Sequence, residues 1–215
     1  MALRLYFAMG SCSLASLIAL EEAGVPFEAE AIMLSAGEQK RPGYLSINPR
    51  GRVPTLLVDE QPITETIAIL SYLANRFSAA ELLPLDNPYL LGRAYELMSW
   101  YATSLHVAIA QIWRTERFCG PNEPCRTAIR EHGRAAIEKG FEEIESILAG
   151  PWILGDRYSV VDGYTQVFWR WGERLGADMP RFRRWAAHSA RLLARAPVMR
   201  ALAKEKHLTE LRTSA

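Results

Sequence analysis

The chain has 215 residues, 49% of them hydrophobic, and its 25 basic and 24 acidic residues give a formal net charge of +1. This length suits one or two domains with a sizeable core, and the charge balance argues against nucleic-acid partners and against strong attraction to anionic membranes. No apolar run approaches the roughly 18 residues of a membrane-spanning helix and the N-terminus lacks a signal-peptide pattern, so we expect a soluble cytoplasmic protein.

The first third of the chain alternates between strand and helix patterns. Apolar and alternating stretches bounded by turn residues predict strands, and the segment that ends at Gly24 has the length and composition of a helix. The expected order is βαβ followed by ββα, with strands at 3–7, 27–33, 55–58 and near residue 63, and helices at 13–23 and 65–77. A polar loop is expected over 35–43.

The remainder of the chain has helical periodicity throughout. Pro84 and Pro88 mark a linker, so we expect an α/β domain over 1–77, a linker over 78–88 and an all-α domain over 89–215. Helices are predicted over about 89–117, 124–148, 160–175, 180–195 and 198–204. Ser159 and Asp162 have the spacing of a capping box at the start of the 160–175 helix, which makes Asp162 a structural residue.

Cys12 lies where the first strand ends and the first helix begins, directly after Gly10 and Ser11. A helix N-terminus leaves backbone N–H groups unpaired and carries partial positive charge, and both effects favour a thiolate. A small buried cysteine is the alternative. We expect a reactive thiol at Cys12, because the junction coincides with a second motif further along the chain.

That second motif is the stretch 48–56, in which Pro54 stands directly before an apolar strand. Proline cannot donate to a sheet ladder, so it belongs at a strand start, edge or bulge, and a cis bond is one way to build such a turn. Further on, Glu65 and Thr66 begin a helix. A helix start binds carboxylates through its N–H groups and Glu65 can hold an ammonium, although simple helix capping explains the same residues.

Two cysteines remain, Cys119 and Cys125, on either side of a five-residue loop. Neither belongs to a CxxC pair or has histidines at zinc spacing, so no metal site is predicted, and the odd total of three favours a reducing compartment. We interpret both as bystanders, with a disulfide between them as the less favoured alternative.

These motifs together resemble the cytosolic glutathione transferase superfamily, most closely its bacterial beta class. The resemblance spans essentially the whole chain and rests on the stretches 10–13, 48–54, 64–66 and 155–162. It implies a thioredoxin-like α/β N-terminal domain, an all-α C-terminal domain, a homodimer, and glutathione as co-substrate. Three residues of the first long helix are then expected near the dimer interface: Tyr95, Ser99 and Thr103.

The resemblance also assigns roles to individual residues. Cys12, Ser11 and His106 would act on the glutathione sulfur, with Ser13 as a further donor. The backbone of Val53, beside Pro54, would pair with the cysteinyl part of glutathione, and Glu65 and Thr66 would hold its γ-glutamyl end. The complete set of expected glutathione-binding residues is Arg52, Val53, Pro54, Glu65 and Thr66.

Helical spacing predicts a second-substrate pocket independently of the family. His106, Ala110, Trp113 and Arg117 recur at i, i+4, i+7 and i+11, which places them on one helix face, and Met9 is expected beside them. Trp113 as an ordinary core residue is the alternative. Such a face suits an apolar or aromatic electrophile.

The chain departs from the beta-class pattern at the expected partner of the glutathione glycyl carboxylate. Val107 stands where several beta-class enzymes have lysine, and the 35–43 loop has no lysine at the usual place. Gln39, Lys40 and Arg41 are the candidate substitutes.

Three functions remain open at this point. The first is conjugation of glutathione thiolate to small electrophiles. The second is glutathione-dependent thiol–disulfide exchange or peroxide reduction through Cys12, with a second glutathione as the resolving thiol because position 15 is Ala. The third is a non-catalytic binding module.

Overall fold

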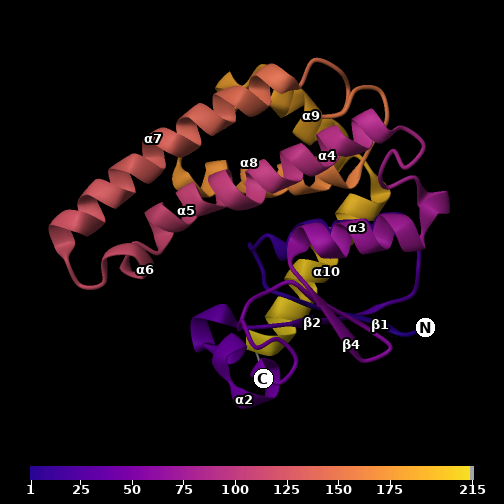
Figure 1. Ribbon diagram of the computed structural model, residues 1–215, viewed down its shortest axis with the longest axis horizontal. Coiled ribbons are helices and arrows are strands. Elements are labelled where there is room, and N and C mark those ends of the chain that lie inside the picture. Colours follow the sequence, from indigo (N-terminus) through magenta and orange to yellow (C-terminus); the bar gives the residue numbers. More distant parts are fainter. Residues whose placement is uncertain (214–215) are drawn as a thin grey trace.

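The computed structural model describes residues 1–213 and shows an α/β region followed by a helical region (Figure 1). The sheet has four strands in the order β2-β1-β3-β4, namely β1 (Leu3–Phe7), β2 (Glu28–Ala31), β3 (Thr55–Val58) and β4 (Gln61–Thr64). β1 pairs parallel with β2 and antiparallel with β3, and β3 pairs antiparallel with β4. Together with α1 (Ser13–Ala23) and α3 (Thr66–Arg76), this is the predicted thioredoxin-like βαβ-ββα order.

The segment expected as a polar loop over 35–43 is instead largely helical. It contains two 3-10 turns, η1 (Leu34–Ala36) and η2 (Glu38–Lys40), and the start of α2 (Pro42–Leu45). Pro42 stands in the first turn of α2, where its missing N–H costs nothing. The prediction of a loop was wrong because turns this short show no helical period.

The helical region contains seven α-helices within residues 1–213. They are α4 (Pro88–Trp100), α5 (His106–Trp113), α6 (Glu116–Cys119), α7 (Glu123–Ile147), α8 (Val160–Leu175), α9 (Arg183–Leu193) and α10 (Ala196–Thr213). The short η3 (Ser78–Ala80) lies between α3 and α4, and η5 (Met179–Arg181) connects α8 to α9. The single helix predicted over 89–117 was wrong in detail: a π-helical stretch, η4 (Tyr101–Leu105), joins α4 to α5, and the helix ends at Trp113.

One hydrophobic core joins the two regions. α1 packs against α3 and, on the helical side, against α8 and α10. Figure 1 shows α10 returning from the helical region to run beside the sheet near β2. Ile18 of α1 and Phe168 of α8 are fully buried in the same cluster. The α/β region and the helical region therefore pack against each other over a shared core.

Asp162 has the structural role expected of it. Its carboxylate accepts hydrogen bonds from the backbone N–H groups of Ser159 (2.8 Å) and Ile153 (2.7 Å), and it lies 2.8 Å from His188 Nε2. The capping box at the start of α8 is complete and Asp162 is fully buried. One carboxylate thus joins the loop before α8, the start of α8, and α9.

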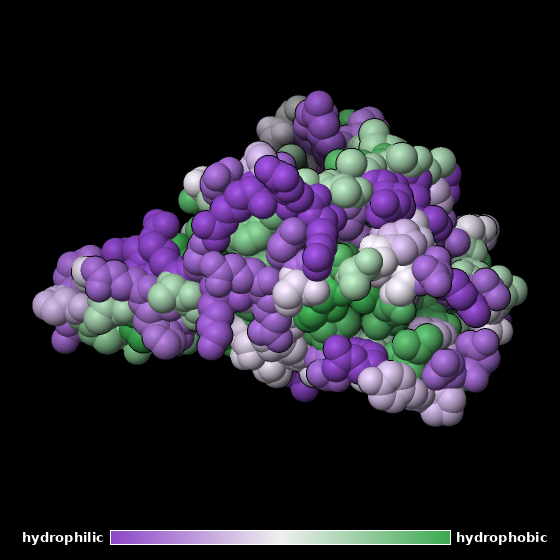
Figure 2. All heavy atoms as spheres, turned by 90° about the horizontal axis from the view of Figure 1, so that it is seen from above, coloured by the Kyte–Doolittle hydropathy of each residue, from purple (hydrophilic) through white to green (hydrophobic). Residues whose placement is uncertain are grey.

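The surface is uneven in polarity. In Figure 2 the projecting end of the molecule, which α6 and the start of α7 form in Figure 1, carries mainly hydrophilic atoms, and hydrophobic atoms gather in the body. Within residues 1–213, no helix combines the length and the apolar character needed to cross a membrane.

Candidate active site between the sheet and the helices

A cavity of about 1080 Å³ lies between the α/β region and the helical region. Its lining comes from the β1–α1 loop, the segment before β3, the start of α3, η4, α5, α6 and α8. Twelve of the sequence-predicted site residues line this cavity: Met9, Ser11, Cys12, Arg52, Val53, Pro54, Glu65, Thr66, His106, Ala110, Trp113 and Arg117.

The β1–α1 loop is held by its own serines. Ser11 Oγ donates to the carbonyl of Ala8 (2.8 Å) and lies 2.6 Å from Ser13 Oγ, which accepts from the backbone N–H of Ala8 (3.0 Å). Ser13 is fully buried and does not line the cavity. The expectation that Ser13 donates to the glutathione sulfur is therefore wrong: its hydroxyl closes the loop, and Ser11 alone reaches the cavity.

Cys12 is the N-cap of α1 and is only 7% exposed. Its Sγ donates a weak hydrogen bond to the carbonyl of Val53 at 3.8 Å. Burial raises the pKa of the thiol to about 11, and the Thr66 hydroxyl and the backbone N–H, which lower it, do not compensate. Desolvation therefore opposes the thiolate that the helix start favours, and a reactive Cys12 stays a prediction.

The segment before β3 holds the Val53-Pro54 peptide bond, which is cis. Behind it, the carbonyl of Arg52 accepts from Asn48 Nδ2 (2.8 Å) and from the Tyr44 hydroxyl (2.6 Å). Asn48 and Tyr44 are both buried. The backbone of Val53 is therefore presented to the cavity from a fixed support.

Glu65 caps α3 in an unusual conformation, with φ 73° and ψ 130°. Left-handed backbone at a non-glycine residue is strained and is concentrated at functional sites. The carboxylate of Glu65 is exposed and lies 3.9 Å from Arg50 Nε, while Thr66 beside it is buried. An exposed carboxylate and the first N–H groups of a helix are thus adjacent at the cavity edge.

His106 begins α5 on the opposite wall, with its ring 4.9 Å from the ring of Trp171. Burial, together with Arg52, Arg117 and Arg114, lowers the pKa of His106 to about 4. The imidazole is therefore neutral at pH 7, and it can donate one hydrogen bond but supplies no positive charge.

The second-substrate face predicted from helical spacing is built from two helices rather than one. Ala110 and Trp113 lie on α5, which ends at Trp113, and Arg117 lies on the separate short helix α6. Trp113 is 36% exposed and packs edge-on against Trp171 at 5.8 Å. The prediction that Arg117 lies on the same helix face as His106 was wrong, because the helix ends before it, although Arg117 still lines the cavity.

Sequence reasoning missed the residues that hold the β1–α1 loop from the helical side. Trp171 Nε1 donates to the carbonyl of Gly10 (2.8 Å), and Glu205 of α10 accepts from the Gly10 N–H (3.0 Å) and from Arg170 (2.9 Å). Arg114 and Arg174 line the cavity as well. No local pattern indicates these contacts, because the partners lie up to 195 positions apart in the chain.

Only one of the three residues expected to replace the beta-class lysine at the glycyl carboxylate lies at the cavity. Gln39 lines the cavity, but Lys40 and Arg41 do not. Gln39 is buried and its Nε2 contacts the carbonyl of Leu34 at 3.5 Å. Val107 also lines the cavity, and it contributes no polar group.

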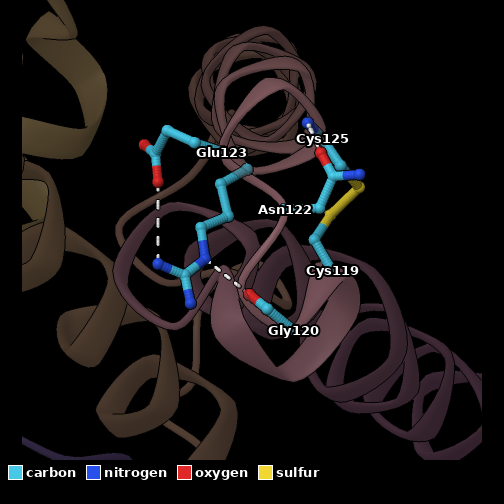
Figure 3. The surroundings of a disulfide bond; sticks show 6 residues. Cys119, Gly120, Asn122, Glu123 and Cys125 are labelled. Atoms are coloured by element: carbon cyan, nitrogen blue, oxygen red, sulfur yellow. Dashed lines mark hydrogen bonds and ion pairs between the residues drawn. A yellow bond between two sulfur atoms is a disulfide. The ribbon is translucent and has the colours of Figure 1, made fainter.

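Cys119 and Cys125 form a disulfide, so the interpretation of both as bystanders was wrong (Figure 3). The bond joins the end of α6 to the first turn of α7. The side chain of Asn122 caps α7 by accepting from the Cys125 N–H (3.0 Å), and Arg126 donates to the carbonyl of Gly120 (2.6 Å). These contacts fix the segment that carries Arg117 and Phe118, two lining residues of the cavity.

Comparison with known proteins relates this chain to glutathione transferases. A model of the glutathione S-transferase N-terminal domain matches residues 1–75. Glutathione S-transferase GstA of Escherichia coli O157:H7 is 30% identical over 206 residues, which cover 94% of this chain and 98% of that protein.

Solved structures agree over nearly the full length. A glutathione transferase homologue from Sulfitobacter, solved with bound glutathione, has a TM-score of 0.89 and 33% identity, covering 96% of this chain and 99% of that chain. A bacterial beta-class enzyme from Sphingomonas chungbukensis has a TM-score of 0.81 and 29% identity, covering 94% and 98%. This chain belongs to the glutathione S-transferase family of enzymes.

Proposed function

We propose that this protein binds glutathione on the α/β side of the cavity and transfers its sulfur to a small electrophile held against the helical side. The observation that carries the proposal is the single cavity of about 1080 Å³ lined by twelve of the predicted site residues. Ligand pockets typically measure about 300–1,000 Å³, so this volume accommodates a tripeptide and a second small molecule together.

The α/β side offers groups that match the ends of glutathione. The exposed carboxylate of Glu65 suits the ammonium of the γ-glutamyl end, and Thr66 with the first N–H groups of α3 suits its carboxylate. The backbone of Val53 suits the cysteinyl amide. Arg52, which directly precedes Val53, and Gln39 also line the cavity, and they are the candidate partners of the glycyl carboxylate.

Cys12 and His106 then act on the glutathione thiol as neutral hydrogen-bond donors. The Cys12 thiol, with its pKa of about 11, is protonated at neutral pH, and the neutral His106 keeps one N–H. Hydrogen bonds to a thiolate stabilise the charged form, each unit of pKa corresponding to about 1.4 kcal/mol. In the reaction the thiol proton passes to solvent, a C–S bond forms, and the leaving group departs with its electron pair.

Exchange chemistry through Cys12 is the less favoured function. With a pKa of about 11, roughly one Cys12 in 10⁴ is a thiolate at pH 7, and only the thiolate attacks a disulfide. Ala15 occupies the place of a resolving cysteine.

We also propose that the protein belongs to the beta class, is located in the cytoplasm and forms a homodimer. Cys12, its flanking serines and His106 support the class. Ser99 and Thr103 are exposed and free to meet a second copy, whereas the Tyr95 hydroxyl lies 2.5 Å from Ser71 Oγ within the same chain. Size-exclusion chromatography with light scattering measures the oligomeric state.

The domain division at 1–77, 78–88 and 89–215 also stays a proposal. The last two residues of the proposed C-terminal domain, 214 and 215, lie outside the described part of the chain.

Retention on immobilised glutathione and conjugation of 1-chloro-2,4-dinitrobenzene test the proposal. Glu65→Gln removes a charged partner of the substrate ammonium, so the KM for glutathione is expected to rise about ten- to a hundredfold. Glu30→Gln, an exposed carboxylate on β2, is the matched control and leaves the KM unchanged. Binding without conjugation would indicate a binding module, and absence of both would refute the proposal.

A further inference from the structure

The cavity concentrates positive charge although the chain as a whole is nearly neutral. Five arginines line it, Arg52, Arg114, Arg117, Arg170 and Arg174, against a single carboxylate, that of Glu65. Over the full chain the basic and acidic residues number 25 and 24. An excess of one sign inside a concave site raises the local concentration of ligands of the opposite sign.

Most of these guanidinium groups have no carboxylate partner. Arg170 is paired with Glu205 at 2.9 Å, but none of the other four forms an ion pair with a residue in the described range 1–213. Arg52, Arg114 and Arg117 also lie close enough to His106 to lower its pKa. Like charges held together without counter-ions favour the binding of an anion.

Three of the unpaired arginines belong to the helical side of the cavity, and one of them lies against the indole of Trp113. Arg114 caps α5 directly after Trp113, and Arg117 follows on α6. Arg174 of α8 places its guanidinium 4.8 Å from the ring centroid of Trp113. A β-carbon at Gly10 would lie 3.6 Å from Arg174 Nη1, so Arg174 also reaches the β1–α1 loop beside Cys12.

Glutathione accounts for only part of this charge. At neutral pH it has two carboxylates and one ammonium, and Glu65 with the start of α3 suits the γ-glutamyl end. Arg52, on the α/β side next to Val53, can meet the remaining glycyl carboxylate. Arg114, Arg117 and Arg174, which come from the helical side, are then available to the second substrate.

We propose that the second substrate carries an anionic group, a carboxylate or sulfonate, on an aromatic or apolar body, and that Arg114, Arg117 and Arg174 bind this anion while Trp113 contacts the body. This inference rests on the proposed function, since it takes the helical side of the cavity as the second-substrate site. Guanidinium groups bind carboxylates through paired N–H donors, and the aromatic face of Trp113 suits a flat ring.

A matched pair of ligands tests the charge preference without requiring a reaction. The protein is saturated with S-methylglutathione, and binding of 3,5-dinitrobenzoate and of its methyl ester is measured by quenching of tryptophan fluorescence and by calorimetry. The carboxylate is expected to bind at least about tenfold more tightly than the ester, because one charged hydrogen bond contributes that much. Added salt should lower the affinity for the carboxylate and leave the affinity for the ester unchanged.

Substitutions locate the anion site. Arg117→Gln and Arg114→Gln should each lower the affinity for the carboxylate several-fold and leave the ester unchanged, and Arg117→Lys should retain part of the preference. Arg134→Gln, an exposed arginine of α7 outside the cavity, is the control. Equal affinity for both ligands, or a preference that survives the Gln variants, would overturn the inference.

Turnover separates this inference from the proposed function. 4-Chloro-3,5-dinitrobenzoate and its methyl ester have the same leaving group, but the ester is intrinsically more reactive, so each kcat/KM is divided by the rate constant of the uncatalysed reaction with glutathione. A higher ratio for the carboxylate supports the inference, whereas equal ratios leave the transferase function standing and refute the anion preference. If neither is conjugated but the carboxylate still binds selectively, the transferase proposal fails and the anion site stands.

Discussion

At the scale of single residues, the decisive feature is the protonation state of Cys12 and His106. Cys12 is buried and His106 half-buried against the cavity wall, and loss of solvent is the largest cause of both pKa shifts. The shifts have opposite signs because desolvation disfavours whichever form is charged: the thiolate of Cys12 and the imidazolium of His106. At pH 7 both side chains are therefore neutral hydrogen-bond donors.

Cys12 is expected to react slowly with iodoacetamide at pH 7 and progressively faster as pH approaches its pKa of about 11. The folded-state pKa lies above the ordinary value of 9.0, so the stability that the buried thiol contributes is fully present below pH 9 and is lost as pH rises through about 11. Intact mass after timed alkylation measures the rate.

Cys12→Ser is the control for this experiment, because the other two cysteines are joined in a disulfide. It should abolish labelling. Complete labelling of the unmodified protein within minutes at pH 7, or a glutathione adduct at Cys12 after incubation with oxidised glutathione, would contradict the assignment and restore the exchange function.

At the scale of elements, the second-substrate wall depends on how α5, α6 and α7 are joined. The chain leaves α5 at Trp113 and α6 is only four residues long, so α6 has little stability of its own. The Cys119–Cys125 disulfide, the Asn122 cap and the bond from Arg126 to Gly120 hold it to α7. Arg117 is therefore positioned by contacts outside its own helix.

Replacement of both Cys119 and Cys125 by Ser is expected to lower the free energy of unfolding by about 2 kcal/mol, the loop-closure value for a short loop. The KM for the electrophile should rise, because Arg117 and Phe118 become less ordered, while the KM for glutathione stays constant. Urea unfolding and steady-state kinetics measure these effects.

Chemical reduction provides the matching control for the double variant. A phosphine reductant should reproduce the kinetic change in the unmodified protein and leave the Ser variant unaffected. If the KM for the electrophile is unchanged both in the reduced protein and in the double Ser variant, the disulfide does not support the second-substrate wall.

At the scale of the whole molecule, the site depends on contacts between the two ends of the chain. Glu205 is 1% exposed and joins α10 to Gly10 and to Arg170 of α8. Trp171 holds the carbonyl of the same glycine. The β1–α1 loop, which carries Ser11 and Cys12, is therefore held by the helical region rather than by the sheet alone.

Glu205→Ala is expected to lower stability by about 2 kcal/mol, because it leaves the Gly10 N–H and Arg170 without a partner. For a chain of this size that loss corresponds to a decrease of about 4–8 °C in Tm. Thermal unfolding followed by circular dichroism measures it, and kcat should fall because the loop that carries Cys12 loses a support.

Glu131→Ala, which removes an exposed carboxylate of α7, is the comparison variant. If both variants melt at the same temperature as the unmodified protein, the link between α10 and the β1–α1 loop has no energetic weight.

Much of the fold could be predicted because its signals are local. The bounds of β1, α1, β3 and α8 agree with the sequence patterns, since Gly24 ends α1 in a left-handed conformation and the Ser159 and Asp162 capping box begins α8. The break between α5 and α6 was not predicted. The apolar period continues through Arg117, and the turn at residues 114–115 has no glycine or proline to mark it.

The sequence by itself determined the order of the elements, the family and twelve of the residues that line the cavity, because periodicity, caps and short motifs depend on neighbours within a few positions. Only the tertiary structure decided the chemistry of the site. The neutrality of Cys12 and His106 follows from burial by distant segments, and the cluster formed by Arg114, Arg117 and Arg174 arises where α5, α6 and α8 meet. Desolvation and charge proximity depend on distances in space, and a linear pattern does not contain those distances.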